Sequence, residues 1–381
     1  MAYTGIAHVN RPTEFFERLR ALADSDPDAG ETLGLDLATS ASVELVGRRW
    51  LDVGTMEGLD AARRYFNKRD NILPKSDESI WFYNSNVIKV HMSPDFIQGR
   101  VERSRVLTPH VPRVKASSQH TYTYGEAPGR DLSLALRDPE FDLEKFFDFL
   151  WSFWSGSAGS KPFLHSNVAD ESYLVFYRDK TAARVRDLVR RFPRMDEDAV
   201  VDGQHVGPAS QLLAKIPWDY LATICPATVH GDLHAENILE TGKDQFLLLD
   251  WRQDLAGSRG ATGDLYYDLG KLAHGFRVDH RTIAKGRFSA QTTDDGTITL
   301  HLEMAERKQE ALDLLEERVR DRGLSWDKVL LMEAVIYLNI ASLHSPDRYA
   351  EFLGYLGRTR AQEVISSLET GSQPSHLHGW E

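Results

Sequence analysis

Two short stretches of the chain contain the residue types that phosphoryl transfer requires. The first is HGDLHAENIL at positions 230–239, and the second is the hydrophobic run FLLL at 246–249, which ends in Asp250. A metaphosphate-like transition state is stabilised mainly by position and charge, so one carboxylate for the attacking hydroxyl and two oxygen ligands for magnesium are enough. Asp232, Asn237 and Asp250 supply this set in the order and spacing of a kinase catalytic loop. The sequence therefore predicts a kinase.

These two stretches resemble a known family. HGDLHAEN followed by LLDW is similar to the aminoglycoside phosphotransferase and choline kinase superfamily, which comprises small-molecule kinases with a protein-kinase-like fold. The resemblance implies that Asp232 is the catalytic base and that Asn237 and Asp250 are magnesium ligands. Protein kinases usually carry His-Arg-Asp and Asp-Phe-Gly in these places. Here Gly231 and Trp251 replace the Arg and the Phe, which favours a small-molecule acceptor over a protein.

The resemblance also implies a fold and a division of the chain. The expected fold class is α+β, with a small antiparallel-sheet N-lobe, a larger and mainly helical C-lobe, and an N-terminal extension. The expected boundaries are an extension over 1–66, an N-lobe over 67–126, a C-lobe with the catalytic loop and acceptor site over 127–371, and a polar tail over 372–381.

The N-lobe should carry a phosphate-binding lysine on a β-hairpin. The β-prone runs 79–83 and 87–91 are joined by Asn-Ser-Asn, which is a hairpin signal. Lys89 lies in the second run, where the superfamily places the lysine that contacts the α- and β-phosphates of ATP. The alternative is an outward-facing lysine on an edge strand.

A helix is expected directly after this hairpin. Ser93 as N-cap and Pro94 at the first helical position predict its start. The superfamily pairs a glutamate of this helix with the lysine, and Glu102 is the best-placed candidate; a solvated glutamate among arginines is the alternative. No Gly-x-Gly-x-x-Gly loop precedes the hairpin, so donors of Ser76 are expected near the phosphates instead.

The C-lobe should hold the acceptor. The break in regularity at 125–132 is interpreted as the hinge between the lobes, and the aromatic residues of 146–154 as core. The arginine-rich segment 178–191 is interpreted as a solvated helix face, with a groove for an anionic partner as the alternative. The resemblance implies acceptor contacts between residues 150 and 220, without a choice among them.

Three further residues are expected to support the catalytic loop. The segment 263–272 resembles the superfamily's Asp-Leu-Ala-type helix, which implies that Asp268 stabilises the loop through hydrogen bonds. Asp264 is either the cap of that helix or a substrate contact. His230 and His234 flank the base, but no third ligand is evident, so zinc is not predicted.

Composition limits the remaining function classes. The chain has 381 residues, of which 41% are hydrophobic and 27% charged, as in ordinary globular proteins. The net charge of −12 disfavours nucleic-acid binding and favours, weakly, a cationic substrate. The single Cys225 excludes an internal disulfide. Neither a signal peptide nor an apolar run of roughly 20 residues is visible, so a cytoplasmic enzyme without membrane contacts is expected.

The N-terminal segment suggests a pathway. Residues 47–55, with Trp50, Asp52 and Gly54, resemble the tail of sugar-phosphate nucleotidyltransferases. Fused transferase–kinase chains of this kind imply surface-polysaccharide synthesis, although a simple packing extension explains the segment equally well.

The sequence thus predicts an ATP- and Mg²⁺-dependent phosphotransferase that acts on a hydroxyl of a small molecule, such as a sugar or amino alcohol for a surface polysaccharide. The alternatives are an aminoglycoside-type antibiotic phosphotransferase and a non-catalytic binding or regulatory protein on a kinase scaffold. The sequence names neither the acceptor nor the oligomeric state.

Overall fold

The computed structural model describes residues 78–156, 163, 166–304, 306–344 and 346–370, together with isolated positions between 13 and 57. The chain divides into two compact units, Met1–Tyr65 and Phe66–Glu381, and the elements below all belong to the second. The expectations for Ser76, for residues 47–54 and for the tail at 372–381 lie outside the described residues.

A four-stranded antiparallel sheet with the order β1-β2-β4-β3 begins the second unit. Its strands are β1 (Glu78–Tyr83), β2 (Asn86–His91), β3 (Val114–Ser117) and β4 (Thr121–Gly125). The hairpin between β1 and β2 turns at Asn84 and Ser85, whose φ angles of 47° and 55° match the left-handed geometry of a two-residue turn. The register places Lys89 on β2 between Ile80 of β1 and Tyr122 of β4.

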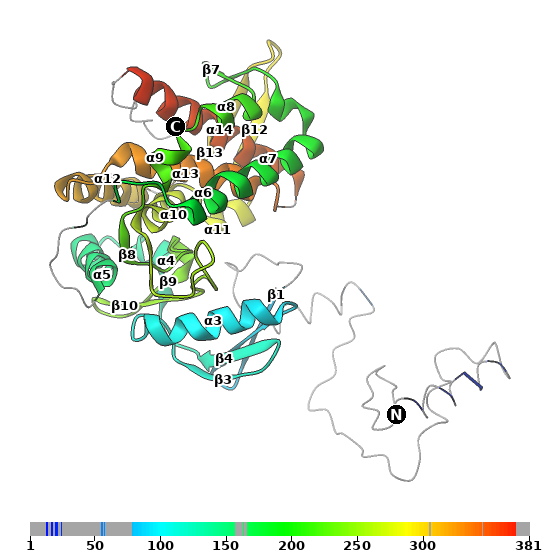
Figure 1. Ribbon diagram of the computed structural model, residues 1–381, viewed down its shortest axis with the longest axis vertical. Helices are drawn as coiled ribbons and strands as arrows, with labels where there is room; N and C mark the ends of the chain where they lie inside the picture. Colours follow the sequence, from blue (N-terminus) through cyan, green and yellow to red (C-terminus); the bar gives the residue numbers. More distant parts are fainter. Residues whose placement is uncertain are drawn as a thin grey trace, which may run out of the picture. The chain divides into compact units, whose positions relative to one another are not determined.

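One long helix, α3 (Pro94–Leu107), packs on this sheet and lies beside β3 and β4 in Figure 1. Ser93 caps it by accepting a hydrogen bond from the backbone N–H of Phe96, and Pro94 occupies the first turn, as the sequence predicts. Ile97 and Leu107 are buried against the strands. The sheet and α3 together form the small N-lobe.

A short connection leads from β4 to the second lobe. It contains β5 (Arg130–Asp131), α4 (Leu132–Ala135) and α5 (Leu143–Ser155). Asp142 caps α5. The aromatic stripe of α5 is core, as predicted, because Phe146, Phe147, Phe153 and Trp154 are all at most 1% exposed.

Short strands flank the two polar stretches that the sequence predicts to be catalytic. They are β8 (Pro226–Thr228), β9 (Ile238–Gly242), β10 (Gln245–Leu248) and β11 (Thr262–Asp264), with the 3₁₀ turn η6 (Ala235–Asn237) before β9. β9 pairs with β10 and β5, and β8 pairs with β11. The two polar stretches of the sequence therefore follow β8 and β10.

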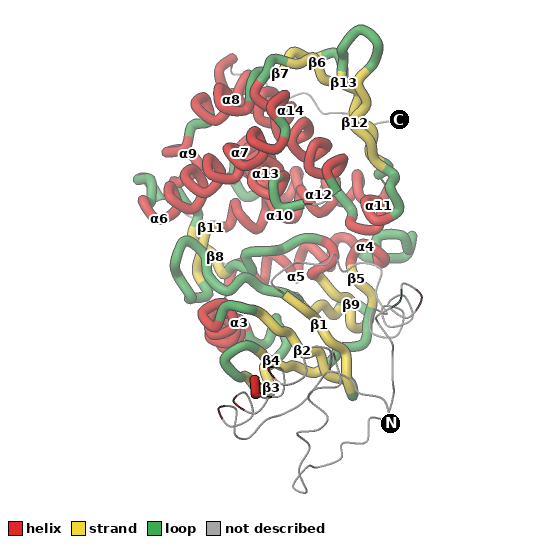
Figure 2. Tube along the Cα trace, turned by 90° about the vertical axis from the view of Figure 1, so that its right-hand side faces the viewer, coloured by secondary structure: helices red, strands yellow, loops and turns green. Residues whose placement is uncertain are grey.

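The rest of the second lobe is helical (Figures 1 and 2). Its helices are α6 (Glu171–Leu174), the π-helix η4 (Val175–Asp179), α7 (Lys180–Arg191), the 3₁₀ turn η5 (Pro193–Asp196), α8 (Ala209–Lys215), α9 (Trp218–Ala222), α10 (Leu265–Arg277), α11 (His280–Ala284), α12 (Glu306–Asp321), α13 (Trp326–Ala341) and α14 (Asp347–Thr370). The nearly all-apolar α13 is the centre of this lobe, because α7, α10 and α14 pack around it. Asp264 is the buried N-cap of α10, which decides between its two expected roles.

A second four-stranded sheet closes the far side of the helical lobe. Its order is β12-β13-β6-β7, formed by β6 (Ala199–Val201), β7 (Gln204–Val206), β12 (Phe288–Thr292) and β13 (Ile298–Leu302). The turn residues Asp294-Asp295-Gly296 predict the β12–β13 hairpin, but no local pattern predicts the parallel pairing of β13 with β6 or the helix α14. The architecture as a whole is the bilobal, kinase-like α+β fold that the sequence predicts. None of the described helices is both long and apolar enough to span a membrane.

Candidate active site

The catalytic loop turns sharply at Gly231. Its φ of 87° lies in the left-handed region, and a Cβ at this position would lie 2.8 Å from Cβ of Arg252. An arginine in this place, as in protein kinases, would therefore be strained and obstructed. The backbone N–H of Arg252 donates to the carbonyl of His230 at 3.1 Å, so the loop after β8 and the loop after β10 lie side by side.

Asp232 faces a lysine that sequence patterns do not reveal. Its carboxylate Oδ1 lies 2.9 Å from Nζ of Lys271, which is on α10. Burial alone would lower the pKa of Lys271, but the adjacent charge of Asp232 raises it above its ordinary value. The side chain of Asp232 is 25% exposed, which leaves it accessible to a substrate hydroxyl.

Asn237 is oriented by the backbone of Asp232. Its Nδ2 donates to the Asp232 carbonyl at 2.8 Å, which fixes the amide and leaves Oδ1 as the atom that can bind a cation. The Asn237 carbonyl accepts from the backbone N–H of Leu249 at 2.7 Å. This bond brings Asp250, the next residue, beside the catalytic loop.

Two cations of the N-lobe converge on Asp250. Nζ of Lys89 lies 3.1 Å and Nη1 of Arg100 lies 3.0 Å from its Oδ1. Lys89 and Arg100 are each only 4% exposed. Burial acts to lower the pKa of both, but the interactions with Asp250, Tyr122 and Glu78 together raise each pKa above its ordinary value. Both side chains therefore remain charged at every physiological pH.

The expected Lys89–Glu102 pair is contradicted by the structure. The carboxylate of Glu102 instead contacts Nη1 of Arg259 at 3.0 Å and Nε2 of Gln98 at 2.7 Å. Glu78 on the neighbouring strand β1 takes the contact with Lys89, at 3.2 Å. The reason is the direction of α3, which turns Arg100 rather than Glu102 towards the site.

Asp268 lies behind the catalytic loop and holds its backbone. Its two carboxylate oxygens accept hydrogen bonds from the backbone N–H groups of His230 and Gly231, both at 2.7 Å, and from the indole of Trp154 at 3.2 Å. Burial raises the pKa of Asp268 to about 6, although these hydrogen bonds oppose the shift. These are the contacts that a supporting role requires; its effect on turnover stays a prediction.

His230 is an uncharged side chain that supports the loop through a hydrogen bond. It is fully buried, and its Nδ1 accepts from the backbone N–H of Asp232 at 3.3 Å. Burial lowers the pKa of His230 to about 3, so the ring is uncharged at neutral pH. It can therefore orient Asp232 without supplying or removing a proton.

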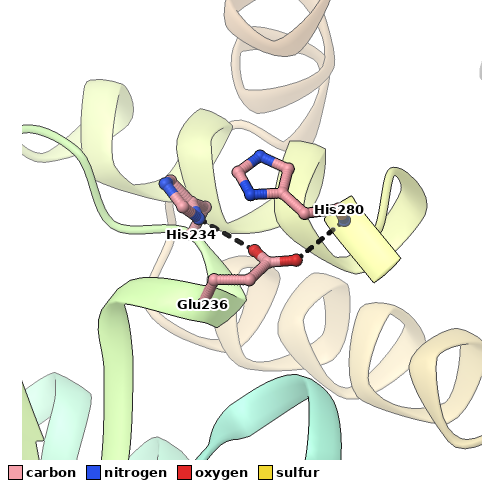
Figure 3. A group of neighbouring side chains, drawn as sticks. All are labelled: His234, Glu236 and His280. Carbon is pink, nitrogen blue, oxygen red and sulfur yellow. Dashed lines mark hydrogen bonds and ion pairs between the residues drawn. The ribbon is translucent and has the colours of Figure 1, made fainter. Parts of the chain in front are cut away.

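His234 joins a buried polar cluster with Glu236 and His280 (Figure 3). Nδ1 of His234 lies 2.9 Å from Oε2 of Glu236, whose Oε1 accepts from the backbone N–H of His280 at 2.9 Å. Burial acts to raise the pKa of Glu236, but His280 and His234 hold it well below its ordinary value. The cluster ties the catalytic loop to the start of α11. The sequence does not predict this cluster, because 44 positions separate His280 from Glu236 in the chain.

Arg103 of α3 connects the N-lobe helix to both loops. Its guanidinium donates to four backbone carbonyls, those of Val229, His230, Arg252 and Gly260, at 2.6–3.2 Å. Burial lowers its pKa to about 10, which still leaves the group charged at neutral pH. The position of α3, and with it Arg100, is thereby fixed relative to Asp232 and Asp250.

The residues around Asp250 fit a magnesium ion. The donor atoms on offer are a carboxylate and the oriented amide oxygen of Asn237, and hard oxygen donors are what Mg²⁺ prefers. Lys89 and Arg100 beside them would face the phosphates that such an ion accompanies.

No protein-family model matches the sequence, and no curated protein is significantly similar to it. Solved structures do match. The chain is similar to small-molecule kinases.

A choline/ethanolamine kinase family protein from Mesorhizobium loti is 14% identical, with a TM-score of 0.42 over 82% of this chain and 99% of that one. A choline kinase from Cryptosporidium parvum Iowa II is 11% identical, with a TM-score of 0.42 over 80% and 90%. The gentamicin complex of APH(2")-IIa is 11% identical, with a TM-score of 0.40 over 81% and 96%.

Proposed function

We propose that this chain is an ATP- and Mg²⁺-dependent phosphotransferase that adds phosphate to a hydroxyl of a small molecule, such as a sugar or an amino alcohol. One observation carries the proposal. The proposal is supported by the bonds that tie Asn237 to the backbone of Asp232 and to Leu249, the residue before Asp250, and by the two buried cations beside Asp250.

Asp232 is the general base. The acceptor's hydroxyl oxygen forms a bond to the γ-phosphorus of ATP, the bond between that phosphorus and the β,γ-bridging oxygen breaks, and ADP leaves with the electron pair. The hydroxyl proton passes to Asp232. Lys271, at 2.9 Å, places its ammonium beside this carboxylate.

Lys89 and Arg100 bind the phosphates of the nucleotide. Each is charged, nearly fully buried and held within 3.1 Å of Asp250, so binding requires no large rearrangement. Magnesium held by Asn237 and Asp250 would neutralise negative charge on the β- and γ-phosphates. Ser76 remains part of this proposal as a phosphate contact from the segment before β1.

The alternative of a non-catalytic kinase-fold protein is disfavoured by the supporting bonds. Asp268, His230 and Asn237 fix the geometry of a carboxylate that a mere binding protein would not need to orient. An antibiotic-modifying enzyme is a narrower version of the same proposal, and it differs only in the acceptor.

The test is phosphoryl transfer from γ-labelled ATP to a panel of sugars, amino alcohols and aminoglycosides, with EDTA and Asp232→Asn as controls. We expect labelled product that requires both magnesium and Asp232. Equal rates for the native protein and Asp232→Asn, or the absence of MgATP binding by calorimetry, would refute the proposal.

A further inference from the structure

A recess opens in the helical lobe beside the proposed base. It lies between η4, α7, α10 and α13 and contains about 290 Å³ of empty space, counted out to the solvent. Lys271 lines the recess and also lies 2.9 Å from Oδ1 of Asp232. Only the side chain of Lys271 therefore separates a molecule in the recess from the carboxylate of Asp232, which would receive the proton of its hydroxyl.

The walls of the recess combine apolar and cationic groups. Phe176, Ile336 and Ile340 provide apolar surface, and Lys180 enters from the first turn of α7. The π-helix η4 widens the turn that presents Phe176 and Lys180 to the same space, and such turns are frequent at functional sites. The lining thus offers carbon surface to the body of a small molecule and the ammonium of Lys180 to a polar group.

Positive charge around Lys180 lacks a matching negative partner. Among the residues that the structure describes, no carboxylate forms an ion pair with Lys180; its ammonium lies 4.8 Å from the ring of Phe176. The guanidinium of Arg252 lies 4.9 Å from the same ring. Lys271 is already paired with Asp232.

The neighbouring positive charges make the protonated form of Lys180 less favourable. Burial, together with repulsion from Arg252, Lys271 and Arg184, lowers its pKa to about 7, and Asp254 opposes the shift. A half-buried cation surrounded by other cations is stabilised when an anion enters, because the anion restores the charged form.

We propose that the acceptor is an alcohol that also carries an oxyanion, a carboxylate or a phosphate, which binds Lys180 and Arg252 while its hydroxyl faces Asp232. This inference rests on the proposed kinase activity and specifies its substrate class. It reverses the weak expectation from the net charge of −12, because the charge of the whole chain does not describe one recess. The arginine-rich segment 178–191, interpreted as a solvated face, contributes its first residues to this site.

Matched acceptors test the charge requirement. D-glucuronate, D-glucose 6-phosphate, D-glucose and D-glucosamine present the same ring with a carboxylate, a phosphate, no charge and a cation; D-glycerate and glycerol form a second pair. We expect kcat/KM to be about tenfold or more higher for an oxyanionic member than for its neutral partner. Comparison of glucuronate with glucose 6-phosphate separates the two sources of the anion. Equal or better use of the neutral or cationic members would overturn the proposal and leave the kinase in place.

Variants of Lys180 test the residue itself. Lys180→Met should raise KM for the anionic acceptor about tenfold, with a smaller change in kcat and none for a neutral acceptor, and Lys180→Arg should restore most of the loss. Arg190→Ala is the matched control, since Arg190 is on the same helix, removes the same charge and has a side chain that is 77% exposed. An equal loss of activity with anionic and neutral acceptors would show that Lys180 acts only on stability.

Binding can be followed without turnover. In protein with ¹³C-methylated lysines, the Lys180 resonance is assigned by its absence in Lys180→Arg, and its pH titration is recorded with sulfate, D-glucuronate or D-glucose, each with and without MgADP. The two oxyanions should raise the pKa of Lys180 and glucose should not. If neither oxyanion moves it, the oxyanion site is refuted. If an oxyanion moves it but no acceptor is phosphorylated and MgATP does not bind, the proposed kinase activity fails and the site stands.

Discussion

The ammonium of Lys89 lies 3.1 Å from the carboxylate of Asp250, although 161 residues separate them in the chain. One comes from a strand of the small lobe and the other from the loop after β10, so this contact joins the two lobes at the proposed nucleotide site. Arg100 reaches the same oxygen from α3. A triphosphate with its metal ion would exchange these contacts for stronger ones, because it brings negative charge to the cations and positive charge to the carboxylate.

Glu78, rather than Glu102, should govern the use of ATP. Glu78→Gln removes a charge-assisted contact that orients Lys89, and it should raise KM for ATP about tenfold. Glu102→Gln is the matched control and should change KM by less than about twofold, since Glu102 pairs with Arg259 at the surface. Steady-state kinetics with varied ATP measure both. A larger effect at Glu102 would mean that α3 rotates when the nucleotide binds.

Replacement of the proposed base should abolish turnover without loss of nucleotide binding. Asp232→Asn keeps the size of the side chain but cannot accept a proton, so kcat should fall by about 100-fold or more. Calorimetry should show a nearly unchanged affinity for MgATP. Asp294→Asn, in the exposed turn between β12 and β13, is the control and should behave as the native protein. Retained kcat in Asp232→Asn would remove this residue from the chemistry.

Arg103 should be a large contributor to stability. Arg103→Met removes a donor from four backbone carbonyls, of which that of His230 keeps the backbone N–H of Arg252, and we expect the free energy of unfolding to fall by about 2–4 kcal/mol. Arg103→Lys should recover only part of this, because an ammonium cannot reproduce the planar fork of donors. Urea unfolding followed by circular dichroism measures the change. A loss below about 0.5 kcal/mol would show that water replaces the guanidinium at little cost.

Asp268 should couple stability to the alignment of the loop. In Asp268→Asn one of the two accepting oxygens becomes a donor that faces the backbone N–H of His230 or Gly231. We expect a loss of about 1–3 kcal/mol in unfolding free energy and a lower kcat with little change in KM for ATP. A variant that loses stability but keeps its full kcat at low temperature would confine Asp268 to a structural role.

The effect of Lys180 on stability should depend on pH with a definite sign. Its pKa is about 7 in the folded chain against an ordinary value of 10.5, so between these values the unfolded chain binds more protons and stability rises with pH. Below pH 7 the full cost of the buried charge is present. Lys180→Met should therefore raise Tm at pH 6 by about 3 °C, and by less at pH 9. Scanning calorimetry at both values checks this; an equal gain at the two pH values would contradict the low pKa.

Local patterns predict much of the fold because the signals are local. The turn at Asn84 and Ser85, the cap at Ser93 and the aromatic stripe of α5 each depend on neighbours in the chain, and each appears where the pattern places it. The pairing of β13 with β6 and the packing of α14 depend instead on contacts between distant segments. No periodicity within either segment encodes them.

The candidate site likewise contains residues that the sequence predicts and residues that only the structure reveals. A sequence motif predicts Asp232, Asn237 and Asp250, because one loop and one hairpin set their spacing. Lys271 and Arg100 reach that loop from helices whose orientation only the packed structure determines. Glu102 failed as a partner for Lys89 for this reason, because a shift of two positions along a helix turns a side chain about 200° around its axis.

The bonds of Arg103 have a consequence for control of the protein. Here an outward swing of α3 would strip donors from four carbonyls at once and also break the bond from the Trp251 indole to the Arg100 carbonyl. All of these bonds hold α3 in place, so we expect its position to stay the same when nucleotide or acceptor binds.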